Sequence, residues 1–149
     1  MHAMFAAMML LREHKDKEGI MSLLMYYDGT DDTRKTISAV KDRAKALHAK
    51  VHVLSSLSSW GDLSVKIIRK MEDGLHYIKN TLDRENIPCD THLLIMGRTP
   101  GEDILDVANK FQVNEIIIGT DKASKIKKFK SSRLINYVSG RARCPVLIV

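Results

Sequence analysis

The residues best able to do chemistry gather near the C-terminal end of the chain. Residues 121–149 hold eight lysines and arginines against one acid, Asp121, a net charge of +7. Since the whole 149-residue chain carries +6, the other residues sum to −1. The protein therefore has one basic segment rather than a basic surface, and such a segment favours an anionic ligand or partner.

The positions around this segment suggest a phosphate site, although each has an ordinary structural alternative. Gly119 follows the apolar run 116–118. Its missing Cβ lets backbone donors approach a phosphate, or it simply allows a helix to pack closely on the sheet or the chain to turn. Ser131 and Ser132 precede the expected last helix and either cap it or help it bind an anion. The lysines between form a solvated loop or an anion-binding loop: Lys122, Lys125, Lys127, Lys128 and Lys130.

Asp28, which ends the first apolar run, has two equal readings. It bonds a hydroxyl or ring nitrogen of a ligand, or it is a turn and capping residue beside Gly29. The six histidines and two cysteines have no metal-ligand spacing, and no nucleophile has an assignable base. Walker and GxGxxG motifs are absent from the sequence. We therefore expect no metal site and no strong catalytic activity.

These residues need a scaffold, and the hydrophobic pattern predicts one. Strands are expected over residues 20–27, 51–57, 90–96, 115–120 and 145–149. Helices are expected to about residue 49 after a turn and N-cap in 28–32, over 64–84, from a capping box at Thr99–Glu102, and over about 131–140. Five strands alternating with four helices indicate an α/β fold with a doubly wound parallel sheet. Ligands of such sheets bind beyond the carboxyl ends of the strands.

The N-terminal segment stands apart from this pattern. Residues 3–11 are apolar, but no basic residue precedes them and no cleavage site follows, as a signal peptide would require. We expect an extra helix over residues 2–17 that packs on the domain or on a partner chain, so that 1–19 is an extension and 20–149 the domain. A frayed tail and a start-codon artefact are the alternatives.

The composition is that of an ordinary globular protein, with 44% hydrophobic and 28% charged residues. Aromatic residues make up only 5%, which disfavours a platform for stacking bases. No apolar run reaches the roughly 20 residues that span a bilayer, so we expect no membrane partner. Two cysteines without a disulfide framework favour the cytoplasm.

The last expected strand predicts self-association. It is apolar throughout and has no charged residue to protect its edge, which invites pairing with another copy of the chain. We therefore expect a homodimer through the C-terminal edge strand, at Val146, Leu147, Ile148 and Val149.

Taken in order, four motifs resemble the universal stress protein family over residues 20–149. They are the first strand into Asp28–Thr30, Gly97-x-x-Pro100, Ile116–Gly119, and the ending Cys144–Val149. The resemblance implies a five-stranded domain of the adenine nucleotide alpha hydrolase type, usually a homodimer. Some members of the family bind ATP and others do not.

The ATP-binding motif of the family, Gly-x2-Gly-x9-Gly-Ser/Thr, is degraded here. Its positions fall on Gly119, Lys122, Ser132 and Arg133, so only the first glycine matches. Lysine stands where backbone must approach phosphates, and arginine replaces a hydroxyl. The chain thus looks like the branch that does not bind ATP.

The same resemblance assigns three further positions. Asp28 matches an aspartate that contacts adenosine, and Ser56 falls where the adenine pocket is lined, usually by an apolar residue. Tyr26 stands where a small residue or proline is common, so its ring could fill the cleft.

The leading hypothesis is therefore a cytoplasmic, homodimeric regulatory or binding module that lacks strong catalytic activity and does not bind ATP tightly. One alternative is an ATP-binding member with slow hydrolysis or phosphotransfer, in which Lys122, Lys125 and Arg133 replace the lost backbone cradle. Another is a protein that binds a polyanion or an acidic partner through residues 122–133.

Overall fold

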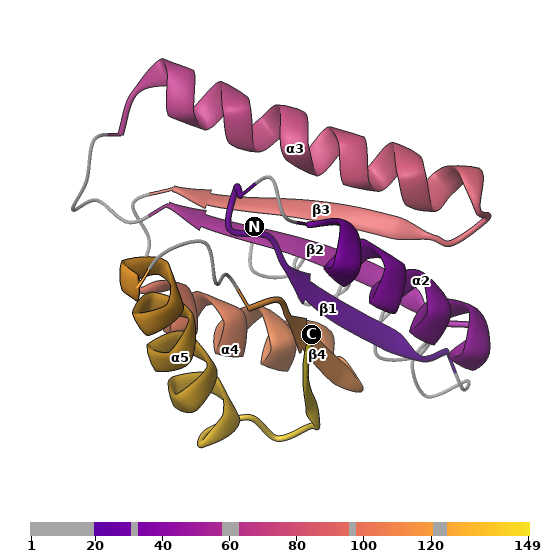
Figure 1. The fold of residues 1–149 in the computed structure, drawn as a ribbon. Helices are drawn as coiled ribbons and strands as arrows, with labels where there is room; N and C mark the ends of the chain where they lie inside the picture. Colours follow the sequence, from indigo (N-terminus) through magenta and orange to yellow (C-terminus); the bar gives the residue numbers. More distant parts are fainter. Residues whose placement is uncertain (1–19, 31–32, 58–62, 96–97, 121–124) are drawn as a thin grey trace, which may run out of the picture.

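The computed structural model describes residues 20–30, 33–57, 63–95, 98–120 and 125–149 (Figure 1). Within them a five-stranded parallel sheet, in the order β3-β2-β1-β4-β5, lies between two helical layers. The strands are β1 (Ser22–Tyr26), β2 (Lys50–Leu57), β3 (Cys89–Ile95), β4 (Glu115–Ile118) and β5 (Val146–Ile148). The helices are α2 (Arg34–Leu47), α3 (Val65–Arg84), α4 (Pro100–Phe111) and α5 (Lys125–Ser139).

This architecture confirms the predicted doubly wound α/β fold. The N-terminal helix expected over residues 2–17 lies outside the described residues. None of the described helices is long and apolar enough to cross a membrane.

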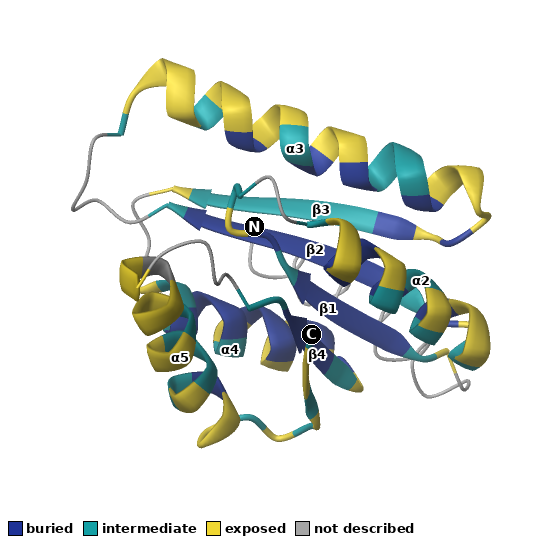
Figure 2. Cartoon of the chain, viewed as in Figure 1, coloured by how far each residue is buried: buried dark blue, intermediate teal, exposed yellow. Residues whose placement is uncertain are grey.

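The centre of the sheet is buried from both sides, as Figure 2 shows. Successive residues of β1 enter opposite layers because side chains alternate along a strand. Leu23 and Met25 pack with the α2 and α3 layer, and Leu24 packs with the α4 and α5 layer. All three are fully buried. The nearly continuous apolar run around them therefore encodes a strand covered on both faces.

The start of α4 follows the predicted capping pattern. The Thr99 hydroxyl accepts a hydrogen bond from the Glu102 backbone N–H at 3.3 Å and donates one to Glu102 Oε1 at 2.9 Å. The Glu102 side chain thus bonds to the hydroxyl of the N-cap residue, Thr99. The N-cap expected within residues 28–32 is misplaced, because α2 begins after Thr33, whose side chain makes no capping bond.

The largest correction concerns α5. A lysine-rich loop and a helix from about Ser131 were expected, but the helix already includes Lys125. Lysine is a good helix former, and no glycine or proline interrupts residues 125–139. Ser131 and Ser132 therefore lie inside the helix and do not cap it. The predicted anion-binding loop, Lys125, Lys127, Lys128 and Lys130, is helical.

Gly101 sets how closely α4 and α5 pack. A Cβ at this position would lie 2.5 Å from Cδ1 of Tyr137. We expect Gly101→Ala to push the two helices apart and lower the free energy of unfolding by about 1–3 kcal/mol, the usual cost of overpacking. Urea unfolding measures the loss. Gly140→Ala is the control with a smaller expected effect, since its nearest contact would be 3.3 Å; equal losses would contradict this account.

Candidate functional site: a cleft beyond the ends of β1 and β4

A cleft of about 530 Å³ opens where the winding of the sheet reverses. The chain leaves β1 toward α2 in one layer and reaches β4 from α4 in the other, although the two strands are neighbours. Such switch points are the usual ligand sites of open α/β sheets, and the volume suits a small molecule. The lining residues are Tyr26, Asp28, Thr30, Thr33, Thr36, Thr99, Pro100, Gly101, Gly119, Thr120, Lys130, Ser131, Arg133, Leu134 and Tyr137.

Gly119 brings the end of β4 against α2. A Cβ there would lie 2.3 Å from Oγ1 of Thr36, so any larger side chain would displace the threonine. The glycine thus serves close packing, which was the structural alternative. It also lines the cleft, so its backbone borders any ligand held there.

Asp28 shapes the turn after β1. Its Oδ1 accepts hydrogen bonds from the Thr30 backbone N–H at 3.0 Å and from the Thr30 hydroxyl at 2.7 Å. Gly29 between them adopts φ +86°, a conformation that glycine adopts most readily. This confirms the prediction that Asp28 stabilises the turn beside Gly29. The carboxylate also lines the cleft, and its residue is exposed, which leaves it accessible to a ligand.

Tyr26 lines the cleft as well, and its ring is largely removed from water. The pKa of its hydroxyl is raised above the ordinary value, first by burial and then by the charges of Asp28 and Asp103. The side chain is therefore a neutral phenol at physiological pH.

Ser56 was expected to line an adenine pocket, but the structure places it outside the cleft. It is buried, its Oγ donates to Oδ2 of Asp103 at 2.6 Å, and it does not line the cleft. Its hydroxyl joins β2 to the first turn of α4. Sequence reasoning could not find this bond because the partners are 47 residues apart.

The cationic wall of the cleft comes from one face of α5. Lys130, Ser131, Arg133, Leu134 and Tyr137 line it, whereas Ser132 does not. Lys122 lies outside the described residues. Of the candidate site residues named from the sequence, the structure therefore brings together Tyr26, Asp28, Gly119, Lys130, Ser131 and Arg133.

Four threonines that line the cleft were missed by sequence reasoning. Thr30, Thr33 and Thr36 all line the cleft, with Thr120 facing them from the end of β4. For Thr33 and Thr36 the spacing was a usable signal, since residues three apart at the start of a helix share one of its faces. Among the described residues no cluster of acids, histidines or cysteines could hold a metal ion.

This combination of a five-stranded parallel sheet, a helical layer on each face and a cleft at the switch point defines a doubly wound α/β fold. A model described as "Universal stress protein family" matches residues 20–149. The chain belongs to the universal stress protein family.

Known relatives agree with this assignment. A universal stress protein of Thermus aquaticus is 25% identical over 134 residues, covering 86% of this chain and 97% of that protein. The universal stress protein structure from Archaeoglobus fulgidus is 21% identical, with a TM-score of 0.73 over 91% of this chain and 97% of that one. A structure from that organism in complex with dAMP is 20% identical, with a TM-score of 0.69 over 87% and 96%.

The raised pKa of Tyr26 predicts a loss of stability in alkali. Below the ordinary tyrosine pKa of 10.0, the folded and unfolded states both keep the proton. Above it, the unfolded state ionises while the folded state stays neutral, so stability falls as pH rises toward the folded pKa. Unfolding in urea between about pH 9 and pH 11 measures the slope. Tyr26→Phe should make the slope of stability against pH less steep, whereas Tyr77→Phe, at an exposed position, should leave it unchanged. Identical slopes for the natural chain and both variants would refute the prediction.

Proposed function

We propose that this chain is a non-catalytic, homodimeric binding module of the cytoplasm, whose cleft binds a nucleoside monophosphate in preference to ATP. The observation that carries the proposal is the pairing of an acidic rim at Asp28 with cations at Lys130 and Arg133 around one cleft. A carboxylate suits the hydroxyls and ring nitrogens of a nucleoside, and the cations suit its phosphate.

Structural neighbours support a nucleotide ligand. Besides the complex with dAMP, one universal stress protein was solved with cAMP, and a family member from Arabidopsis thaliana with AMP. These proteins have TM-scores of 0.69, 0.68 and 0.60 to this chain. They are distant in sequence, so the residues of this chain decide which nucleotide fits.

The backbone of α5 argues against tight ATP binding. A polyphosphate cradle needs backbone N–H groups that are free to point at the ligand. In a helix that begins at Lys125, only the N–H groups of the first turn lack a partner within the helix. Those of residues 130–133 bond to carbonyl groups one turn earlier. Residues 130–133 therefore offer side-chain cations in place of backbone donors, and two cations neutralise a monophosphate more completely than a triphosphate.

The cleft also lacks an evident catalytic apparatus among the residues that line it. Among the residues that line the cleft, Asp28 carries the one carboxylate, and its Oδ1 already accepts two hydrogen bonds from Thr30. Residues of this kind hold and orient a ligand. A reducing compartment suits the two free thiols, Cys89 and Cys144.

Calorimetric titration with AMP and with Mg-ATP at physiological salt tests the ligand. We expect AMP to bind more tightly than Mg-ATP, and Lys130→Gln or Arg133→Gln to weaken AMP binding at least tenfold, because a charge-assisted hydrogen bond contributes about 1.5–3 kcal/mol. Lys128→Gln is the matched control, since Lys128 is exposed on the same helix but does not line the cleft. Tighter binding of ATP, or no binding of AMP, would sink the proposal.

Among the described residues β5 is an edge strand of the sheet, and this supports the dimer. Val149 donates to Ile118 and accepts from Thr120, and Pro145 accepts from Ile116, so odd-numbered residues face β4. By the alternation of a strand, the backbone groups of Val146 and Ile148 point to the open edge. Leu147 and Ile148 are 37% and 47% exposed there. An uncharged apolar edge of this kind pairs readily with a second copy.

Ile148→Pro tests the dimer because it deletes an outward N–H and leaves the bonds of Val149 to β4 in place. We expect sedimentation equilibrium to show a dimer for the natural chain and a monomer for the variant. Ile95→Pro is the matched control: Ile95 is 41% exposed and ends β3, the opposite edge. A dimer that survives Ile148→Pro, or that only Ile95→Pro dissociates, would place the interface elsewhere.

A further inference from the structure

The first half of α5 exposes two large apolar side chains that nothing in the described chain covers. Ile126 is 69% exposed and Phe129 is 62% exposed. The second half of the same helix behaves as a core helix: Leu134, Ile135, Tyr137 and Val138 all belong to the apolar cluster beneath α4. The exposed large apolar side chains of α5 are therefore confined to the end of the helix that lies beside the carboxyl edge of the sheet (Figures 1 and 2).

Cations surround these two side chains. Ile126 and Phe129 are three residues apart and share a side of the helix. Lys125 and Lys128 are exposed beside them, and the guanidinium of Arg133 lies 5.8 Å from the centre of the Phe129 ring. Residues 125–133 hold five lysines and arginines and no acid. A partner for this surface must therefore be anionic and must also accept apolar groups.

The shape of the surface narrows the choice. Lys125, Ile126, Lys128 and Phe129 line neither the cleft nor the smaller cavity beside Cys144. They project from a helix, so they have no groove to offer a peptide segment. A nucleic acid would use the cations, but stacking onto bases needs more than one aromatic ring and leaves Ile126 without a role.

The start of α3 repeats the arrangement on a smaller scale. Val65 is 72% exposed and Ile67 is 37% exposed, beside Lys66, Arg69 and Lys70. In Figure 1 both helices begin on the same side of the molecule, at the carboxyl ends of the strands. An extended surface can meet both helix ends together, which a short ligand cannot.

We propose that the exposed start of α5, residues 125–129, is a peripheral docking surface for an anionic lipid bilayer. This differs from the expectation of no membrane partner, which rested on the lack of an apolar run long enough to span a bilayer. Ile126 and Phe129 enter the boundary between headgroups and acyl chains, and the surrounding cations meet the lipid phosphates. This is how basic helices with a few large apolar residues lie on membranes without crossing them. Long lysine side chains adapt to the headgroup level while their stems cover apolar surface.

Flotation with lipid vesicles tests the proposal on the full chain. Phosphatidylcholine vesicles with and without phosphatidylglycerol are compared at physiological salt. We expect binding only to the anionic vesicles. Each lysine near an anionic surface contributes about a fivefold increase in partitioning, so Lys125→Gln/Lys128→Gln should reduce binding by about 30-fold.

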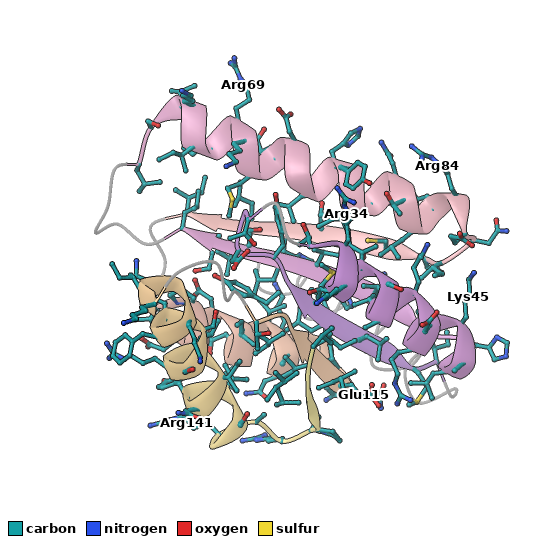
Figure 3. The ribbon with its side chains drawn as sticks, in the orientation of Figure 1. Arg34, Lys45, Arg69, Arg84, Glu115 and Arg141 are labelled. Atoms are coloured by element: carbon teal, nitrogen blue, oxygen red, sulfur yellow. The ribbon has the colours of Figure 1, made fainter. Side chains whose placement is uncertain are left out.

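Matched variants separate this surface from the rest of the molecule. Lys45→Gln/Arg84→Gln has the same net charge but changes the opposite end of the molecule in Figure 3, and its binding should equal that of the natural chain. Phe129→Ser should weaken binding severalfold, whereas Tyr77→Ser should not, although Tyr77 is 61% exposed. Circular dichroism confirms that each variant is folded.

Three outcomes would overturn the proposal. The natural chain would fail to float with anionic vesicles, or Lys125→Gln/Lys128→Gln and Lys45→Gln/Arg84→Gln would weaken binding equally. In the third outcome Lys125→Gln/Lys128→Gln would lose binding, but Phe129→Ser and Ile126→Ser would keep it. Random duplex DNA would then also compete with the vesicles. That result would define a general polyanion surface. Lys125, Ile126, Lys128 and Phe129 do not line the cleft, so variants of these residues test membrane binding separately from nucleotide binding.

Discussion

The burial of β1 on both faces is the constraint on which the rest of the structure depends. Leu23, Leu24 and Met25 are fully shielded from water, which requires a helical layer on each side of the sheet. A chain with right-handed crossovers can supply both layers only if its winding reverses beside β1. The reversal separates the segments that follow β1 and β4, and the cleft forms between them. A site at the ends of these strands is thus a consequence of how the core is buried.

Much of this could be predicted from the sequence because the signals are local. Apolar runs gave the five strands, and Asp28 and Gly119 stood at the strand ends that border the cleft. The start of α5 was not predictable in the same way, because exposed lysines are equally compatible with a loop and with a solvated helix. The Ser56 to Asp103 bond joins distant parts of the chain and has no local signature. Sequence therefore located the cleft better than it described its walls.

The early start of α5 changes the chemistry that the cleft can offer. A glycine-rich loop presents backbone dipoles fixed in direction, whereas Lys130 and Arg133 present mobile charges. Backbone donors select a ligand by geometry, and exposed cations select it mainly by charge. Charge attraction weakens with salt over a Debye length of about 8 Å under physiological conditions. This is why the ligand that we propose is a small, compact anion, with Asp28 and the threonines of the cleft beside its remaining atoms.

α5 has no single apolar stripe, and its three sets of contacts explain why. Leu134 and Val138 face the core, Lys130 and Arg133 face the cleft, and Ile126 and Phe129 face outward. A helix that only covered a sheet would place its large apolar residues on one side. Solvent alone does not explain large apolar groups among cations at the exposed end, because burial of such groups is favourable and their exposure is not. The sequence of α5 is thus better explained by three sets of contacts that change along the helix than by packing on the sheet alone.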